Sequence, residues 1–431
     1  MARPVATGTT RTVTYCDRSD LRMGWAASVS GQTQSWLSDV AAPGLHGGRR
    51  RHLPRLTFAN ALTFGAFFGI GFLAPTLGPG IVPVDVLILV MIVMWIPSIG
   101  EGEPRGVLRP MLIPLAVILA GSLLGTMAVG IKPWIVTDLI KDVSAFASFF
   151  AVIVVLRNGG PSTIRAAGWA CALATIMVCL ALIKDVGSRA DATFANPNIA
   201  AHYLVTNLVV LTRVPIPRWL RIGAIGLGVI GLAVTGSFGA ALMSIGAFGY
   251  LLVTLPQARR RILVKRLAVV SVVILGGVMI FSGGDVLGTS STETGFNDRH
   301  FERSSEGRFG KWTAAIDVTL ENPLGIGPGS NRGLALLPGE QEAHNEYLAY
   351  LSERSIVGLI GLILLYMSLW RIGPRGGLTR ALVIGFALQS LVRETFHYRH
   401  LWLILGLAVV LDTSYRFIPR PERRLQAPVA P

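Results

Sequence analysis

The feature that most limits how this chain can fold is a series of long apolar runs separated by short polar linkers. A transmembrane helix needs about 20 apolar residues to cross the hydrocarbon core of a bilayer. In lipid, a helix satisfies its backbone hydrogen bonds within its own segment. The sequence therefore predicts an all-α fold, a polytopic transmembrane helix bundle of about 12 spans. The predicted spans are 56–77, 81–99, 110–130, 138–156, 164–183, 198–212, 221–235, 239–255, 267–282, 345–370, 381–396 and 401–417.

Composition supports this class and argues against others. Only 15% of the residues are charged, whereas soluble domains carry about 25%. The net charge of +15 raises the question of nucleic acid, but no arginine cluster is interleaved with the stacking aromatic residues that such binding uses. The cysteines have no metal-ligand spacing, which argues against a structural zinc site. Cys171 and Cys179 fall within one apolar run and are interpreted as packing residues.

The arginines predict the orientation of the bundle. Short cytoplasmic linkers of membrane proteins carry an excess of Lys and Arg. With a cytoplasmic N-terminus, every inside linker is basic, whereas the short outside linkers carry only Lys132, Lys184, Arg189, Arg393 and Arg399. We therefore expect a multi-pass membrane protein with both termini in the cytoplasm. The bias toward Arg, Ala, Gly and Val suggests a bacterial genome, and with it an inner-membrane location. The predicted organisation is a disordered tail (1–48), nine helices (49–282), a large extracytoplasmic loop (283–343), three helices (344–418) and a second tail (419–431).

Two outside segments stand out from the other linkers. The segment 283–343 is about 60 residues long, and loops of that length in a membrane protein commonly carry function. Within it, 308–320 has helical apolar spacing, and the run Asn322-Pro323-Leu324-Gly325-Ile326-Gly327-Pro328-Gly329 is expected to end that helix. In the segment 184–197, Asn196 is a plausible N-cap for a helix that begins at Pro197.

Three motifs occur together on the predicted outside. They are Thr193-Phe194-Ala195-Asn196-Pro197-Asn198; Gly307-Arg308 with Trp312 and then Asn322-Pro323-Leu324-Gly325-Ile326-Gly327; and Ala343-His344-Asn345-Glu346-Tyr347. In this order, the motifs resemble the O-antigen ligase and O-antigen polymerase superfamily of membrane glycosyltransferases. The resemblance covers most of the chain from about residue 56 onward.

The resemblance implies an activity and its partners. The family's enzymes transfer a glycan from an undecaprenyl-diphosphate-linked donor to an acceptor hydroxyl, on a glycan or a lipid-linked sugar, at the outer face of the inner membrane. The resemblance implies no cofactor and no metal, and the outside segments contain no Asp-x-Asp pattern of metal-dependent transferases. Membrane lipids are the remaining expected partner.

The leaving diphosphate directs attention to the outside arginines, because an arginine fork engages phosphate oxygens bidentately. By resemblance, Arg308 and Arg189 are carried over as diphosphate ligands, and Arg332 is a weaker candidate, as are Arg303 and Arg299. The alternative is that these arginines anchor the loops near anionic lipid headgroups.

His344 is, by resemblance, the general base that takes the proton of the acceptor hydroxyl. Histidine titrates near neutral pH, which suits that task. Asn345 either caps the following helix or orients the acceptor. Tyr347 lies on the same helical face as His344 and is a candidate substrate-binding residue. The alternative for His344 is an ordinary residue at the start of an amphipathic helix.

Further charged residues fall near the outside ends of the spans. Glu353 lies within a span and needs a partner, expected on another helix because its neighbour Arg354 points elsewhere. Asp138 and Lys141 can pair at the i, i+3 spacing, with Asp142 beside them. The segment 389–400, which includes His397 and His400, either lines the donor cavity or contacts headgroups.

Other functions stay open. Ligase and polymerase differ in their acceptor, which the helix pattern does not encode. A multi-span transporter or flippase of lipid-linked glycans is the principal alternative, although such proteins tend to show repeats and interrupted spans. A peptidoglycan polymerase of the shape, elongation, division and sporulation family shares the chemistry and usually has fewer spans.

Overall fold

The computed structural model describes residues 57–71, 83–95, 105–184, 194, 196–235, 237–254, 256, 296–333 and 344–414, with the backbone alone for 296–308, 332–333 and a few residues at helix ends. All of them belong to one compact unit, Pro54–Phe417. The predicted tails 1–48 and 419–431, the predicted span 267–282 and Arg189 lie outside the described residues.

The described residues form helices and no strand, which confirms the predicted all-α class. The helices are α2 (Phe58–Gly69), α3 (Pro83–Trp95), α4 (Arg105–Val129), α5 (Pro133–Lys184), α6 (Pro197–Leu211), α7 (Arg218–Thr235), α8 (Phe238–Thr254), α10 (Phe296–Glu321), α11 (Ser330–Gly333), α12 (Glu346–Ile372), α13 (Leu378–Gln389) and α14 (Arg399–Ser414). Each predicted span other than 267–282 falls on one of these helices.

Two boundaries differ in kind from the prediction. The predicted spans 138–156 and 164–183 both lie in α5, whose only non-helical residue is Gly160 at φ 70 and ψ −157, just before Pro161. The predicted span 381–396 was wrong at its end, because α13 stops at Gln389. Residues 390–398 instead form an ordered loop, and the backbone groups of that loop bond to α12 and α14.

Four of the described helices are long and apolar enough to cross a membrane: Gly106–Val129 of α4, α5, α7 and α12. The shorter apolar helices include α13, whose 12 residues extend about 18 Å at 1.5 Å per residue. That is less than the roughly 30 Å of a hydrocarbon core.

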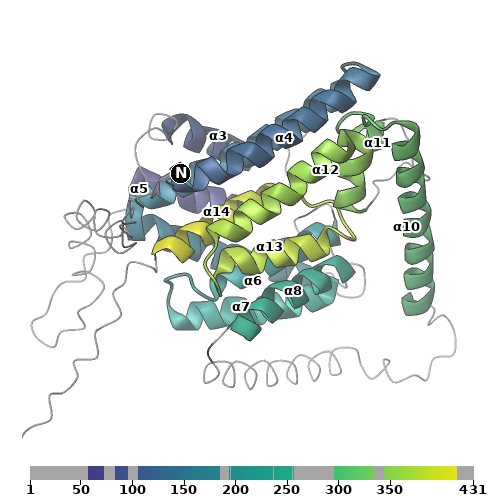
Figure 1. Ribbon diagram of the computed structural model, residues 1–431. Coiled ribbons are helices and arrows are strands. Elements are labelled where there is room, and N and C mark those ends of the chain that lie inside the picture. Colours follow the sequence, from purple (N-terminus) through teal and green to yellow (C-terminus); the bar gives the residue numbers. More distant parts are fainter. Residues whose placement is uncertain are drawn as a thin grey trace, which may run out of the picture. The chain divides into compact units, whose positions relative to one another are not determined.

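The helices pack mostly side by side. Helix α4 lies along α12, α13 lies against α8, and α5 contacts α2, α7 and α14 (Figure 1). Helix α10 contacts α12 and runs across the end of the bundle at which α11 lies (Figure 1).

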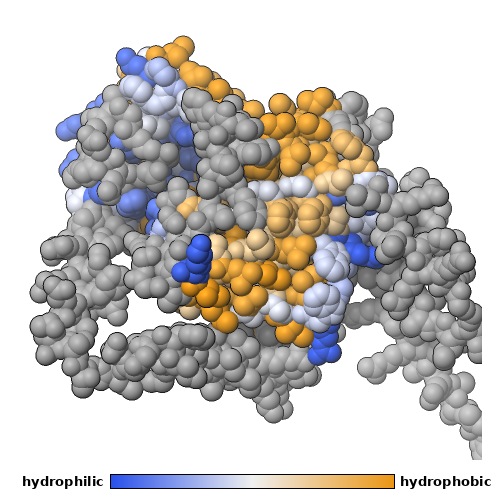
Figure 2. Space-filling view, turned by 180° about the vertical axis from the view of Figure 1, so that it is seen from behind, coloured by the Kyte–Doolittle hydropathy of each residue, from blue (hydrophilic) through white to orange (hydrophobic). Residues whose placement is uncertain are grey.

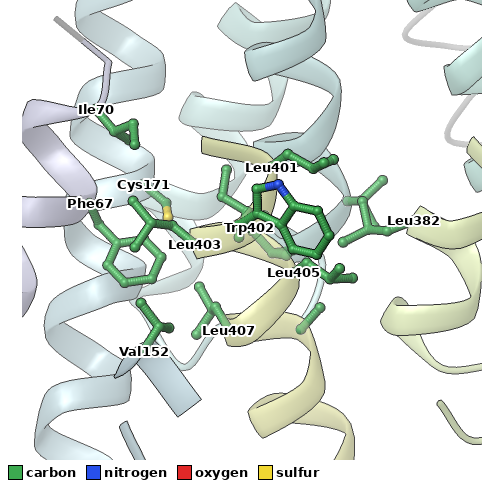
Figure 3. Packing of buried hydrophobic residues seen from close by; sticks show 14 of the residues in the cluster. Phe67, Ile70, Val152, Cys171, Leu382, Leu401, Trp402, Leu403, Leu405 and Leu407 are labelled. Atoms are coloured by element: carbon green, nitrogen blue, oxygen red, sulfur yellow. The ribbon is translucent and has the colours of Figure 1, made fainter. Parts of the chain in front are cut away.

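The core centres on α14. Trp402 is 1% exposed and meets Phe146, Phe149 and Phe396 edge to face. Figure 3 shows Leu401, Leu403, Leu405 and Leu407 of the same helix among side chains from α2, α5 and α13. The indole Nε1 donates to the carbonyl of Phe396 at 2.7 Å, so the polar end of the largest buried side chain is satisfied.

Small residues allow α4 and α12 to approach closely. A Cβ on Gly121 would lie 2.5 Å from the carbonyl oxygen of Arg354, and one on Gly361 would lie 2.7 Å from the backbone nitrogen of Ile118. Glycine at such positions lets membrane helices pack backbone to backbone. The sequence of α4 therefore favours the contact that brings Ser122 next to the middle of α12.

Large apolar side chains lie on the outside of the bundle. Met127, Ile245 and Val253 are 81%, 69% and 73% exposed. Hydrophobic residues cover much of the visible helix surface in Figure 2, and hydrophilic residues gather mainly at the left of that view. An apolar exterior of this kind is expected of a multi-pass membrane protein, whose helices face lipid instead of water.

Contacts between helix ends fall into two groups, which supports an up-and-down arrangement. At the first end, which we call the His397 end, the Arg399 Nε lies 2.5 Å from Asp85 and His397 contacts Asp138. At the opposite, Asp412 end, Arg213 pairs with Asp412 at 3.2 Å. The residues of the first group lie in linkers predicted outside or at the span ends next to them, and those of the second group lie in or near linkers predicted inside.

Candidate functional site

The first turn of α12 fixes the position of His344. Asn345 is the N-cap: its Oδ1 accepts from the Leu348 amide at 3.1 Å, and its Nδ2 donates to the Leu391 carbonyl at 3.0 Å. Asn345 was predicted either to cap this helix or to orient the acceptor, and the structure shows the capping role. His344, one residue earlier, is partly exposed and has a φ of 51°. A non-glycine residue in the left-handed region costs about 1–3 kcal/mol, and such residues cluster at active sites.

The loop 390–398 folds over this first turn and is bonded to it. The Glu346 amide donates to the Ser390 carbonyl at 2.8 Å. The Glu346 carboxylate accepts from the amides of Thr395 and Phe396. Tyr347, predicted to contact substrate, donates its hydroxyl to the Ala387 carbonyl at 2.9 Å. The predicted residues His344, Asn345 and Tyr347 therefore lie on a rigidly braced turn at the His397 end.

His397 joins that loop to the start of α5. Its Nε2 lies 3.4 Å from Asp138 Oδ2, and its Nδ1 lies 3.4 Å from Asp142 Oδ1. The predicted pair between Asp138 and Lys141 is present at 3.0 Å. Sequence reasoning noted both segments but did not join them, because nothing local links residues on α5 to a loop more than 250 positions later.

A buried ion pair lies deeper in the bundle. The Arg354 Nη1 is 2.5 Å from Asp142 Oδ2 and 2.7 Å from Ser122 Oγ. The guanidinium also lies over the Tyr350 ring, 4.8 Å from its centroid. Arg354 is 1% exposed and Asp142 5%, and charged groups at such depth need a partner. Asp142 is thereby shared between Arg354 and His397.

Helix α12 is interrupted at Arg354 and Ser355, whose backbone angles are not helical. Arg354 has φ −122 and ψ 15, and Ser355 has φ 62 and ψ 179. A regular helix would use the carbonyls of Ser352 and Glu353 to accept from amides four residues on. Here they accept from the amides of Ile326 at 3.0 Å and Gly327 at 2.9 Å. The segment 322–331, which we call the strap, therefore completes the broken turn.

Three glycines allow the strap to lie this close. Gly325, Gly327 and Gly329 have φ of 85, 84 and 70, where other residues are strained. A Cβ on Gly325 would lie 2.6 Å from the Glu353 carbonyl oxygen, and one on Gly329 would lie 2.9 Å from Asp138 Cγ. Residues 325–329, Gly-Ile-Gly-Pro-Gly, thus contain glycine where the strap lies directly against α12 and α5.

Glu353 holds the far end of the strap. Its Oε2 accepts from the Gly329 amide at 2.9 Å, and its Oε1 accepts from the Asn331 amide at 3.0 Å. Asn331 Nδ2 also donates to Ser352 Oγ at 3.0 Å, and Trp134 Nε1 donates to Ser330 Oγ at 3.1 Å. The prediction for Glu353 was a partner on another helix. The structure instead gives this carboxylate two backbone amides, that of Gly329 before α11 and that of Asn331 within it.

The predicted arginines are placed only by their backbones. Arg308 lies on α10 and Arg332 on α11, and their side chains, like Arg189, lie outside the described part of the chain. Helix α10 rests on the same turn as His344, because the buried Ala315 packs with Leu348 of α12. The backbone thus brings the helices of Arg308, Arg332 and His344 to the His397 end.

The predicted start of α6 is confirmed nearby. Asn196 caps the helix by accepting from the Asn198 amide at 2.8 Å, with Pro197 in the first position. One turn further, His202 Nδ1 lies 2.6 Å from His400 Nε2, and both side chains are fully buried. Sequence reasoning did not find this pair, because its members lie 198 residues apart.

Within the described residues, no group of three His, Cys, Asp or Glu side chains is arranged to hold a metal ion. The described side chains at the His397 end offer imidazole, carboxylate and hydroxyl groups, and the helices of the predicted Arg308 and Arg332 lie beside them. Cys171 and Cys179 are buried thiols of α5, as their packing interpretation predicts.

Comparison with known families identifies this region. Residues 223–366 match the family model described as O-Antigen ligase. The match runs from α7 through α8, α10, the strap and α11 to α12, and so includes Arg308, Arg332, His344 and Glu353. A comparison with curated proteins finds no match. Residues 223–366, from α7 to α12, are therefore similar to an O-antigen ligase domain.

Proposed function

We propose that this protein is an inner-membrane glycosyltransferase that moves a glycan from an undecaprenyl-diphosphate donor to an acceptor hydroxyl at the outer face. The observation that carries the proposal is the family match, which covers the helices of Arg308, Arg332 and His344. The packing of α10 on the first turn of α12 supports placing these residues in one site.

In the proposed reaction, the acceptor oxygen attacks the anomeric carbon of the donor sugar. A new glycosidic C–O bond forms as the bond between that carbon and the diphosphate oxygen breaks. Undecaprenyl diphosphate leaves with the bonding electrons, and the acceptor's proton passes to His344. His344 has a left-handed backbone and directly precedes the N-cap Asn345, which is bonded to the loop 390–398. This fixed position suits a base, because a base must lie within hydrogen-bond reach of the proton that it takes.

The arginines are proposed to bind the leaving diphosphate. Arg308, Arg189 and Arg332 would meet its charge with planar donor forks, which is the largest electrostatic contribution available without a metal. Arg354 is not a candidate for this task, since it is 1% exposed and already bonded to Asp142 and Ser122. The proposal includes independence from a divalent metal.

The bundle is proposed to have about 12 spans, both termini in the cytoplasm, and 283–343 outside. The arginine-rich linkers predicted inside include those that meet at the Asp412 end, where Arg213 also donates to the Gly376 carbonyl at 2.5 Å. This grouping supports the His397 end as the outer one. The choice between polymerase and ligase is left to the acceptor assay.

The decisive experiment uses purified protein in nanodiscs with a glycan on undecaprenyl diphosphate. Transfer is scored as released undecaprenyl diphosphate and as chain growth or ligation, in the presence of EDTA. We expect transfer to persist with the chelator. A transporter or flippase would move the donor across a bilayer without releasing the diphosphate. Loss of transfer that Mg²⁺ or Mn²⁺ restores would refute the metal-independent mechanism.

A further inference from the structure

The strap joins the two helices that carry predicted diphosphate ligands, and its last residues, Ser330 and Asn331, open the second of them. Helix α10, with Arg308, ends at Glu321, and the strap follows at once. Helix α11, with Arg332, begins at Ser330. The course of the strap therefore sets where both backbones stand relative to α12.

Glu353 is the one side chain of α12 whose two carboxylate oxygens each accept from a different amide at the end of the strap, Gly329 and Asn331, among the described residues. The second of these amides directly precedes Arg332 in the chain. Because Glu353 is only 8% exposed, both bonds lie away from water, where they are costly to lose.

Residues 329–331, which Glu353 bonds, also lie between two neighbouring side chains, Asp138 and Trp134. Gly329 lies against Asp138, so a Cβ there would lie 2.9 Å from the Cγ of Asp138. On the other side, Trp134 holds Ser330 through its indole at 3.1 Å. With Asp138 on one side and Trp134 on the other, the Glu353 carboxylate fixes the positions of residues 329–331 through its two amide bonds.

We infer that Glu353 is a positioning residue for donor binding, which acts by holding the strap so that Arg332 and Arg308 stand at the diphosphate. The inference rests on the proposed function, since it concerns the same donor. Glu353 does not touch the donor in this scheme. It acts through the backbone amides of Gly329 and Asn331.

The bundle contains a matched control with the same chemistry at its opposite end. The Asp412 carboxylate accepts from the amides of Leu378 at 2.9 Å and Thr379 at 2.8 Å, and it is 3% exposed. A carboxylate-to-amide substitution at either residue replaces one acceptor with an NH₂ group that faces an N–H donor. Both substitutions should lower stability, but only the one at Glu353 disturbs the strap.

The experiment compares Glu353→Gln, Asp412→Asn and wild type in nanodiscs. It measures the Kd of undecaprenyl diphosphate, backbone hydrogen exchange of 322–331 and the thermal midpoint. We expect Glu353→Gln to weaken binding by about 10- to 100-fold, the size of effect that a small misplacement of ligand-holding groups produces, with faster exchange in the strap. Asp412→Asn should lower the midpoint without changing either value.

A second variant covers the case in which Glu353→Gln does not fold. Asn331→Ala removes only the bond to Ser352 Oγ and should weaken binding in the same direction, by less. Unchanged binding in folded Glu353→Gln or Asn331→Ala would overturn the inference, as would equal losses in Asp412→Asn.

Arg308→Ala and Arg332→Ala separate this inference from the proposed function. If both variants bind undecaprenyl diphosphate as wild type does, the proposed diphosphate ligands are wrong, and the positioning role falls with them. If both variants lose binding while Glu353→Gln retains it, the ligands stand and only the role of Glu353 is refuted.

Discussion

Arg354 and Asp142 lie 212 positions apart in the sequence and form a buried ion pair whose closest atoms are 2.5 Å apart. The pair connects the break in α12 to α5, and Ser122 of α4 completes it. Three helices thus meet at one guanidinium. Because Asp142 also contacts His397, the same pair extends to the loop that covers the first turn of α12.

Removing one partner of this pair should be more damaging than removing both. Arg354→Met leaves the Asp142 carboxylate buried without its main cation, and breaking a buried pair costs about 3–5 kcal/mol. The double variant Arg354→Met with Asp142→Leu removes both charges, and it should recover a large part of the loss. Thermal midpoints in one detergent measure this, and additive losses in the double variant would contradict it.

Ser355→Gly should stabilise the protein. At φ 62 and ψ 179, Ser355 occupies a region used almost only by glycine, at a cost of about 1–3 kcal/mol. Its hydroxyl recovers part of that cost by accepting from the Val357 amide at 3.2 Å. The expected result is a higher thermal midpoint for Ser355→Gly and a clearly lower one for Ser355→Val. A drop in Ser355→Gly would mean that the hydroxyl bond outweighs the strain.

Substitutions at His344 and at Arg308 should affect donor binding and turnover differently. If His344 is the base, His344→Ala cuts turnover by about 10²–10⁴ with little change in donor binding. Arg308→Lys keeps the charge but loses the bidentate fork, so both donor binding and turnover should suffer. Binding and transfer are measured on the same folded preparations. Full turnover in folded His344→Ala would remove His344 from the mechanism.

The proposed orientation can be tested by labelling. In a variant without native cysteines, Ser304→Cys should react with an impermeant thiol reagent in intact spheroplasts, and Gln257→Cys should react only after the membrane is opened. The reason is the arginine excess in the linkers predicted inside. The reverse pattern would place 283–343 in the cytoplasm and move the proposed site to the other face.

The sequence by itself determined the helical class, the approximate positions of the described helices, the cap at Asn196 and the end of α10 before Asn322-Pro323. Hydropathy, capping and turn chemistry depend on residues a few positions apart, so they can be read locally. The family resemblance could also be recognised from the sequence, because it depends on short motifs that follow one another in a fixed order along the chain. The site residues drawn from that resemblance remain predictions.

Only the tertiary structure decided how the charged and polar groups pair. The end of α13 at Gln389 depends on Asn345 and Glu346, which bond to the backbone of 390–396 in place of a further helical turn. The partners of Glu353, Arg354 and His397 likewise come from distant segments. A buried charge takes the group that packing brings to it and that compensates its lost hydration, and no local pattern encodes which group that is.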